Sequence, residues 1–131
     1  MPNRIDRYQN VTKGWREFDG RRCFLKSLWE INYAHYLQWL KNQGQILDWW
    51  YEDTAFWFES IKRGVTNYKP DFRVLESNGS VVFYEVKGYM DAQSKTKLKR
   101  MAKYHPEIDL RVIGKAEYVE IMKYGRLFGA E

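Results

Sequence analysis

The amino-acid sequence predicts a mixed α/β domain in which a central β-sheet of mixed strand direction is flanked by helices. Short segments rich in aromatic and β-branched residues alternate with two longer segments of helical apolar spacing, and turn-forming residues separate them. The run VVFYEV at 81–86 is apolar almost throughout, which is typical of a strand buried on both faces and therefore central in its sheet. The expected order of the core elements is αβββαβ, followed by a final helix.

The first half of the chain is expected to contain a basic segment, a buried helix and an aromatic hairpin. Residues 1–22 carry six basic residues against three acids and show little apolar periodicity, so we interpret them as a basic N-terminal arm, with an ordinary solvated terminus as the alternative. Residues 22–41 contain neither Gly nor Pro and have helical apolar spacing, and Asn-Gln-Gly at 42–44 is a stop signal. The aromatic-rich segments 45–53 and 54–60 are predicted to pair as a hairpin, with Glu52 as a charge at its end.

The second half is expected to contain two strands, a helix, a strand and a final helix. The strands at 70–77 and 81–88 are joined by a tight turn, Ser-Asn-Gly-Ser, at 77–80. Asp91 is placed to cap a helix over 91–105, and a fifth strand at 109–114 and a helix ending at Gly125 follow. We therefore divide the chain into the arm, 1–22, and one domain, 23–131.

The composition favours a basic protein of the cell interior. The chain has 131 residues and a net charge of +5, which favours a polyanion such as nucleic acid as partner, although charge alone is compatible with other partners. The single cysteine, Cys23, excludes an internal disulfide and a multi-cysteine zinc site. No apolar run approaches the roughly 18 residues that span a membrane, and no secretory signal is recognisable. We expect a cytoplasmic protein without membrane contact.

Two carboxylates fall at the same end of the predicted hairpin. Asp71 begins the strand at 70–77 and Glu85 lies near the end of 81–88, so the hairpin brings them onto neighbouring strands. Two carboxylates that close repel each other unless a divalent cation lies between them, and hard oxygen ligands are those that Mg²⁺ prefers. Glu85 and Lys87 point to the same side because side chains alternate along a strand. The alternative is a surface Asp and a Glu–Lys pair at a fraying strand end.

This arrangement has the groups that phosphodiester hydrolysis needs. A metal held by the two acids could polarise the phosphodiester and lower the pKa of a bound water. Lys87 would place a cation beside the attacked phosphate. Glu30 lies in the predicted helix, with Ser27 one turn before it, and could ligate the metal through water or a second ion.

Pro70-Asp71, the hairpin, and Glu85-Val86-Lys87 together resemble the signature of the PD-(D/E)xK nuclease superfamily, over roughly residues 24–113. The resemblance implies a restriction-endonuclease-like core with Asp71 and Glu85 as metal ligands, Lys87 as the catalytic lysine, Glu30 as the helical acid and the Val86 carbonyl as a backbone ligand.

Within that superfamily, the small basic domain looks most like phage or archaeal-type Holliday junction resolvases. That resemblance implies a homodimer that uses Mg²⁺ or Mn²⁺ and no small-molecule cofactor, resolves four-way DNA junctions by paired nicks, and could be phage-encoded and act in a host cytoplasm.

The helix after the motif favours DNA as the substrate. Five basic residues fall within nine positions that contain no acid, and their like-charged i,i+4 pairs are mildly destabilising without a polyanion. Gln93 is a candidate to reach the site from the start of this helix. The residues assigned to DNA contact are Lys95, Lys97, Lys99, Arg100 and Lys103 in the helix, and Arg4, Arg7, Arg21 and Arg22 in the arm.

Two other interpretations stay open. A related nuclease could act on plain duplex or flapped DNA in restriction, repair or transposition. A nuclease fold could also serve as a non-catalytic DNA-binding module, although binding alone gives no reason to keep carboxylates that repel DNA. Dependence on a divalent metal separates these possibilities.

Overall fold

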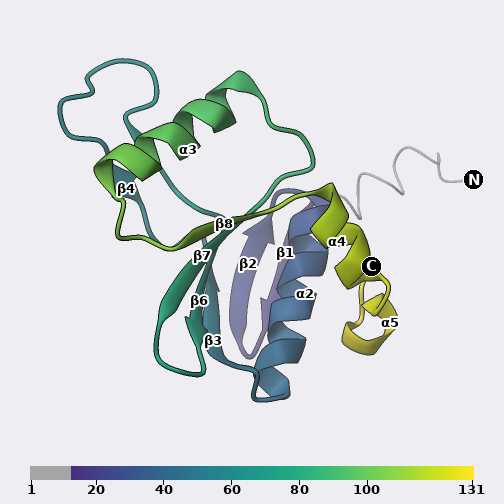
Figure 1. Ribbon diagram of the computed structural model, residues 1–131. Helices are drawn as coiled ribbons and strands as arrows, with labels where there is room; N and C mark the ends of the chain where they lie inside the picture. The colour runs from purple at the N-terminus through teal and green to yellow at the C-terminus, as the bar shows by residue number, and fades with distance from the viewer. Residues whose placement is uncertain (1–12) are drawn as a thin grey trace, which may run out of the picture.

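The centre of the fold is a four-stranded sheet with the strand order β3-β6-β7-β8 (Figure 1). The computed structural model describes residues 13–131 of the chain. β3 (Ile46–Tyr51) and β7 (Val81–Val86) are antiparallel to β6 (Phe72–Glu76), and β8 (Leu110–Ile113) is parallel to β7. The predicted mixed α/β fold is confirmed, and β7 is an interior strand, as its apolar run indicated.

The β6–β7 hairpin and its turn form as predicted. Phe72 lies opposite Tyr84 and Leu75 lies opposite Val81. Gly79 has a φ of 87°, a value that glycine adopts without steric cost, and it allows the chain to reverse directly after Glu76. Residues that precede β6 therefore lie beside residues at the end of β7.

One long helix, α2 (Leu28–Asn42), packs on this sheet and forms the main core with it. Ile31, Ala34 and Leu37 are almost fully buried in that core, beside Trp49 and Phe72. The helix begins at Leu28, rather than at residue 22 as predicted, because Ser27 caps it and the preceding residues form a strand.

The predicted boundary of the arm at residue 22 is wrong. β1 (Gly14–Phe18) and β2 (Arg21–Leu25) pair as an antiparallel ribbon, and Phe18 and Leu25 are buried in the main core. Asp19 and Gly20, with φ values of 50° and 80°, form the turn between them. Arg21 and Arg22 thus belong to the fold, whereas Arg4 and Arg7 lie outside the described residues.

The predicted hairpin of residues 45–60 is also wrong. β3 pairs with β6, while β4 (Phe56–Trp57) pairs with β5 (Asn67–Tyr68) in a separate two-stranded sheet. Aromatic content indicates strand conformation but not the partner strand, and β3 takes its place in the sheet because Trp49 is buried against α2 and the ribbon.

The small sheet is covered by α3 (Ala92–Tyr104), which Asp91 caps as predicted by accepting a hydrogen bond from the Ser94 N–H. Met101 of α3 packs with Phe58 and Tyr68 in a second, smaller core. Figure 1 shows α3 and the β4–β5 segment on one side of the molecule and α2 on the other.

The last part of the chain forms two short helices rather than one. α4 (Lys115–Met122) follows β8, and α5 (Gly125–Phe128) starts at the glycine that was predicted to end the final helix. Phe128 of α5 is buried beside Tyr36 and Trp39 of α2. Within residues 13–131, no helix has the length and apolar character that crossing a membrane requires.

Candidate active site

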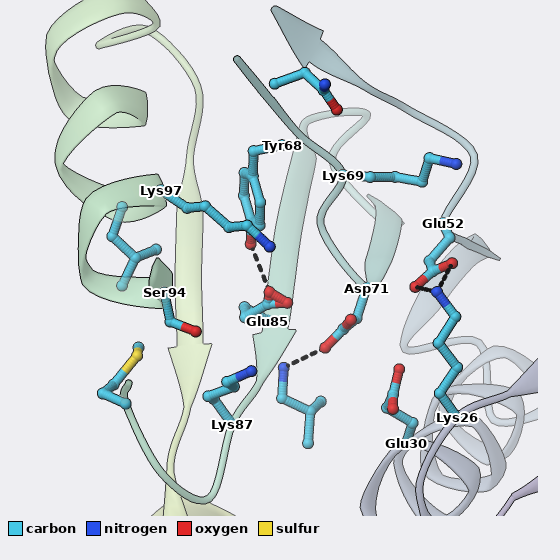
Figure 2. Close-up of a pocket in the computed structure, with 14 residues that line it drawn as sticks. Lys26, Glu30, Glu52, Tyr68, Lys69, Asp71, Glu85, Lys87, Ser94 and Lys97 are labelled. Carbon is cyan, nitrogen blue, oxygen red and sulfur yellow. Dashed lines mark hydrogen bonds and ion pairs between the residues drawn. The ribbon is translucent and has the colours of Figure 1, made fainter. Parts of the chain in front are cut away.

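A polar pocket of about 490 Å³ lies between the start of α2, the end of β7 and the first turns of α3 (Figure 2). Its walls carry equal numbers of acidic and basic side chains. The acidic residues are Glu30, Glu52, Asp71 and Glu85, and the basic residues are Lys26, Lys69, Lys87 and Lys97. The four residues predicted to be catalytic, Glu30, Asp71, Glu85 and Lys87, therefore all line one pocket.

Asp71 is the most enclosed acid of the β6–β7 hairpin and lies next to Glu85. It directly precedes β6, is 9% exposed, and accepts a hydrogen bond of 2.8 Å from the Val86 N–H through Oδ2. Burial raises the pKa of Asp71 above its ordinary value, and the neighbouring charges of Glu85 and Glu30 raise it further. The hydrogen bond from the Val86 N–H acts in the opposite direction but does not offset the effects of burial and of the two neighbouring acids on the pKa of Asp71.

Glu85 is held by a buried tyrosine. The Tyr68 hydroxyl donates a hydrogen bond of 2.7 Å to Glu85 Oε2, and the Tyr68 side chain is buried in the smaller core. Burial raises the pKa of Glu85, while the Tyr68 hydroxyl and the Lys87 ammonium act in the opposite direction. The carboxyl group is thus fixed in orientation, while burial disfavours its charged form.

Glu30 is held in a similar way at the start of α2. Its Oε1 accepts 2.8 Å from the Tyr51 hydroxyl, and its Oε2 accepts 2.8 Å from the Ser27 hydroxyl. The Ser27 oxygen also accepts 3.1 Å from the Glu30 N–H, so the helix cap and the carboxylate position each other. Ser27, predicted as a supporting residue, thus contacts Glu30 through both its hydroxyl hydrogen and its oxygen.

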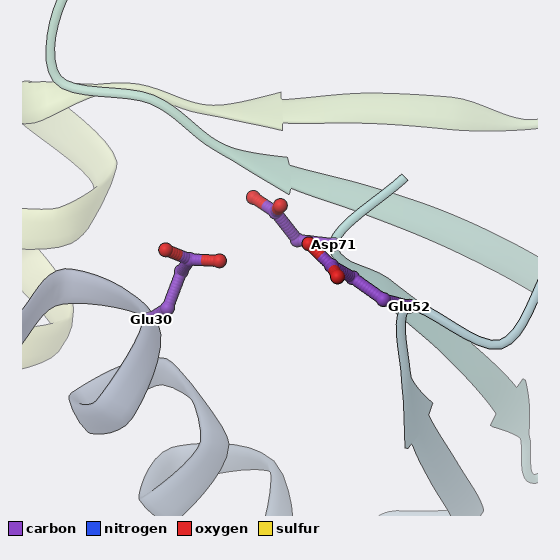
Figure 3. Close-up of side chains that lie close together, drawn as sticks. All are labelled: Glu30, Glu52 and Asp71. Carbon is purple, nitrogen blue, oxygen red and sulfur yellow. The ribbon is translucent and has the colours of Figure 1, made fainter. Parts of the chain in front are cut away.

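Glu52 joins the pocket, although its sequence position suggested only a charge at a hairpin end. One oxygen each of Glu30, Glu52 and Asp71 lie within 4.8 Å of one another (Figure 3). Glu52 has a φ of 46°, which is uncommon for a residue with a β-carbon, and its N–H donates to the Asp71 carbonyl at 2.8 Å. The backbone is therefore bent just where this side chain enters the pocket.

Lys26 is the internal counter-ion of the cluster. Its Nζ lies 3.0 Å from both carboxylate oxygens of Glu52 (Figure 2). This hydrogen bond raises the pKa of Lys26 above its ordinary value. Lys26 therefore pairs with Glu52. The other three carboxyl groups of the pocket accept hydrogen bonds from hydroxyl or backbone N–H groups instead.

The donor set fits a divalent hard cation. Carboxylate oxygens are the ligands that Mg²⁺ and Mn²⁺ prefer, and three of them converge here from α2, from the end of β3 and from the start of β6. Val86 lines the same pocket, and its role as a backbone ligand stays a prediction.

The residues predicted to contact DNA fall into different places. Lys97 lines the pocket, with its Nζ 6.0 Å from the Tyr68 ring centroid, while Lys95, Lys99, Lys103 and Gln93 are exposed on α3. Gln93 is not among the pocket residues, whereas Ser94 is.

Three arginines assigned to DNA contact have partners within the fold. Arg100 donates to the Val65 carbonyl and so ties the β4–β5 segment to α3. Arg21 pairs with Asp48 at 2.5 Å. Arg22 lies over the Trp15 ring, 4.9 Å from its centroid.

Sequence reasoning missed four residues of the site, namely Lys26, Tyr51, Glu52 and Tyr68. None belongs to a short motif, and the contacts of Tyr51 and Tyr68 with their carboxylates span 21 and 17 residues. An available signal was the hydroxyl of each tyrosine in an otherwise apolar setting, because a buried hydroxyl needs a partner.

No family model matches the chain, and neither a curated protein nor a solved structure matches it.

Proposed function

We propose that this protein is a metal-dependent endonuclease that hydrolyses phosphodiester bonds in DNA, with four-way junctions as its substrate. The observation that carries the proposal is the pair of desolvated carboxyl groups, Asp71 directly before β6 and Glu85 near the end of β7, with Lys87 next to them. Titratable groups whose pKa values are shifted by burial and by neighbouring charges are typical of functional sites. The likeness of this set to the PD-(D/E)xK signature supports the same reaction.

Asp71, Glu85 and Glu30 would hold a divalent cation, with Glu52 as a further oxygen donor. A cation bound there supplies polarisation of the phosphodiester and lowers the pKa of a water molecule. The role of the protein is to hold the carboxylates in converging positions, and the hydroxyls of Tyr51 and Tyr68 orient Glu30 and Glu85 by donating to one oxygen of each.

The lysines of the pocket would act on the phosphate. Lys87 follows β7 directly, and its ammonium would stabilise the negative charge that develops on the attacked group. Lys97 reaches the same pocket from α3 and would position the neighbouring phosphate. The exposed Lys95, Lys99 and Lys103 on α3 would extend this contact along the DNA backbone.

Junction specificity and a homodimer belong to the same proposal. Two active sites related by a two-fold axis would face two equivalent strands of a four-way junction. Two alternatives are a nuclease that cuts plain or flapped duplex DNA and a non-catalytic DNA-binding module. One assay distinguishes both of them from this proposal.

The assay compares a labelled four-way junction with a linear duplex of matched sequence, in Mg²⁺ and in chelator. The proposal predicts paired, symmetric nicks in the junction alone, only in Mg²⁺ or Mn²⁺, and a dimer mass by light scattering. Equal cutting of both DNAs would support the nuclease activity and contradict the preference for junctions. Binding without cutting in either metal would contradict the nuclease.

A further inference from the structure

The β1–β2 ribbon has one buried and one exposed face. Phe18 and Leu25 belong to the buried face, and residues at alternate positions point the other way. On the outward face, Trp15 and Phe24 lie directly opposite each other and are 57% and 41% exposed. Adjacent exposed rings form a contiguous apolar patch, and such patches often mark a contact surface.

The two rings form one platform with a cation at its edge. Their centroids are 5.4 Å apart in an edge-to-face arrangement, and the Arg22 guanidinium lies 4.9 Å from the Trp15 centroid. Trp15 is thus held by neighbours on both sides while much of its surface stays exposed. The acid on this face, Glu17, lies opposite Arg22, at the end away from the pocket.

This platform is continuous with the pocket. Lys26 directly follows β2, two residues after Phe24, and it lines the pocket and holds Glu52. The positions 22, 24 and 26 span roughly 13 Å along the ribbon at about 3.3 Å per residue. A cation, an aromatic pair and a second cation therefore follow one another from the ribbon to the acids.

We propose that the outward face of the β1–β2 ribbon binds an unpaired DNA strand that continues into the pocket. Bases stack on Trp15 and Phe24, and phosphates contact Arg22 and Lys26. Exposed rings alternating with cations are the pattern by which proteins hold single strands, because every base has a face that can stack. This inference rests on the proposed nuclease function and adds that the bound DNA is unpaired beside the cut.

The chemistry of the face favours this occupant over a protein partner. Its apolar part consists of two rings bounded by Arg22 and Lys26, whereas the core of a protein interface is depleted in charged residues. A blunt duplex offers no exposed base faces along its length. An unpaired strand satisfies both the rings and the cations.

The test measures DNA binding in buffer that contains chelator and no divalent metal ion, so that no cleavage step contributes. Fluorescence anisotropy would compare a fluorescein-labelled duplex that bears a single-stranded overhang with a blunt duplex of equal base pairs. Trp15→Ala and Phe24→Leu should each weaken binding of the overhang probe by about tenfold and change binding of the blunt probe by less than about twofold. Phe24→Leu keeps the side chain apolar and removes only the ring.

Two controls keep the test independent of folding. Trp15→Tyr retains a stacking ring and should bind the overhang probe nearly as wild type does. Leu127→Ala removes another exposed apolar side chain, on α5, and should change neither probe. Circular dichroism of each variant checks that the ribbon is intact.

Equal weakening of both probes, or of neither, by Trp15→Ala would overturn the proposal. So would conversion of a dimer to a monomer by Trp15→Ala with unchanged affinity for the overhang probe, since the face would then bind a second copy. If the wild type binds as expected but cuts no DNA in Mg²⁺, the ribbon surface stands and the nuclease fails.

Discussion

Two aspartates at the same end of the sheet, Asp53 and Asp71, have opposite electrostatic environments. Asp53 receives a two-pronged ion pair from the Arg73 guanidinium, with contacts of 3.0 and 2.5 Å, and this pairing outweighs partial burial so that the pKa of Asp53 is lowered. Asp71 lies two residues before Arg73 in sequence, but it faces Glu85 and Glu30, and its pKa is raised.

The difference extends to other acids of the molecule. Asp48 pairs with Arg21, and Glu131 pairs with Arg16, which lowers the pKa of Glu131 to about 2. In the pocket, Asp71 and Glu85 are held by a backbone N–H and a tyrosine hydroxyl instead. The fold can pair its acids with arginines, and the absence of an arginine partner for Asp71 and Glu85 among the described residues is what the proposed cation site would explain.

The largest expected effect is on cleavage. Asp71→Asn or Glu85→Gln removes a metal-binding oxygen and should lower the rate of DNA cleavage in Mg²⁺ by at least about 10²–10³-fold. Junction binding should be kept or strengthened, because negative charge near the phosphates is removed. Asp53→Asn is the matched control and should cost at most about 1 kcal/mol of stability, with cleavage unchanged. If both Asp71→Asn and Glu85→Gln still cleave DNA, the proposed active site is contradicted.

The next effect concerns the tyrosine that holds Glu85. Tyr68→Phe keeps the ring in the smaller core and removes the hydroxyl donor, so we expect affinity for Mn²⁺ to fall by about 10–100-fold. Calorimetric titration with Mn²⁺ measures this without DNA. Tyr84→Phe removes a hydroxyl outside the pocket, 3.5 Å from Glu76, and should leave Mn²⁺ affinity unchanged. An unaltered affinity in Tyr68→Phe would show that the hydroxyl has no positioning role.

A smaller effect is expected from the lysines of α3. Replacing Lys97 and Lys99 together with alanine should weaken DNA binding about tenfold at moderate salt and reduce the slope of log affinity against log salt by about 1–2. The same double change at Lys115, in α4, and at Lys123, directly after α4, is the control. A slope that stays at the wild-type value would move the DNA contact away from α3.

The smallest effect is a pH dependence of stability. Because the pKa of Asp71 and Glu85 is raised in the folded chain, the stability from these groups is complete below about pH 4 and is lost as pH rises through their folded-state values. In chelator, the Tm of wild type relative to Asp71→Asn should therefore fall by a few degrees from about pH 5 to about pH 8. Mg²⁺ should restore it at about pH 8 and have little effect at about pH 5, since metal and protons compete. A pH-independent difference in Tm would contradict the raised pKa.

The sequence predicted the parts of the site that local structure determines. The Asn78-Gly79 turn and the apolar run of β7 are sufficient to place Asp71 beside Glu85, and helical spacing gave Glu30 a place on α2. The Asp19-Gly20 turn, which lies between residues of alternating character, is an equally local hairpin signal, and it could have revealed the ribbon.

Glu52 and the two tyrosines depend on non-local pairing, which sequence periodicity does not determine. Glu52 reaches the pocket because β3 pairs with β6 across the β4–β5 segment. Tyr68 reaches Glu85 because Met101 and Phe58 bury its ring beneath α3. Neither partner choice has a signal in the short segments that form these strands.

A calorimetric titration of Mn²⁺ into the metal-free protein, its Asp71→Asn variant and its Asp53→Asn variant would test the proposed cation site directly. We expect the wild type and Asp53→Asn to bind Mn²⁺ with the same affinity, and Asp71→Asn to bind it at least about tenfold more weakly. Wild-type affinity in Asp71→Asn, or no binding by the wild type, would contradict the claim that the pocket keeps its carboxylates for a divalent cation.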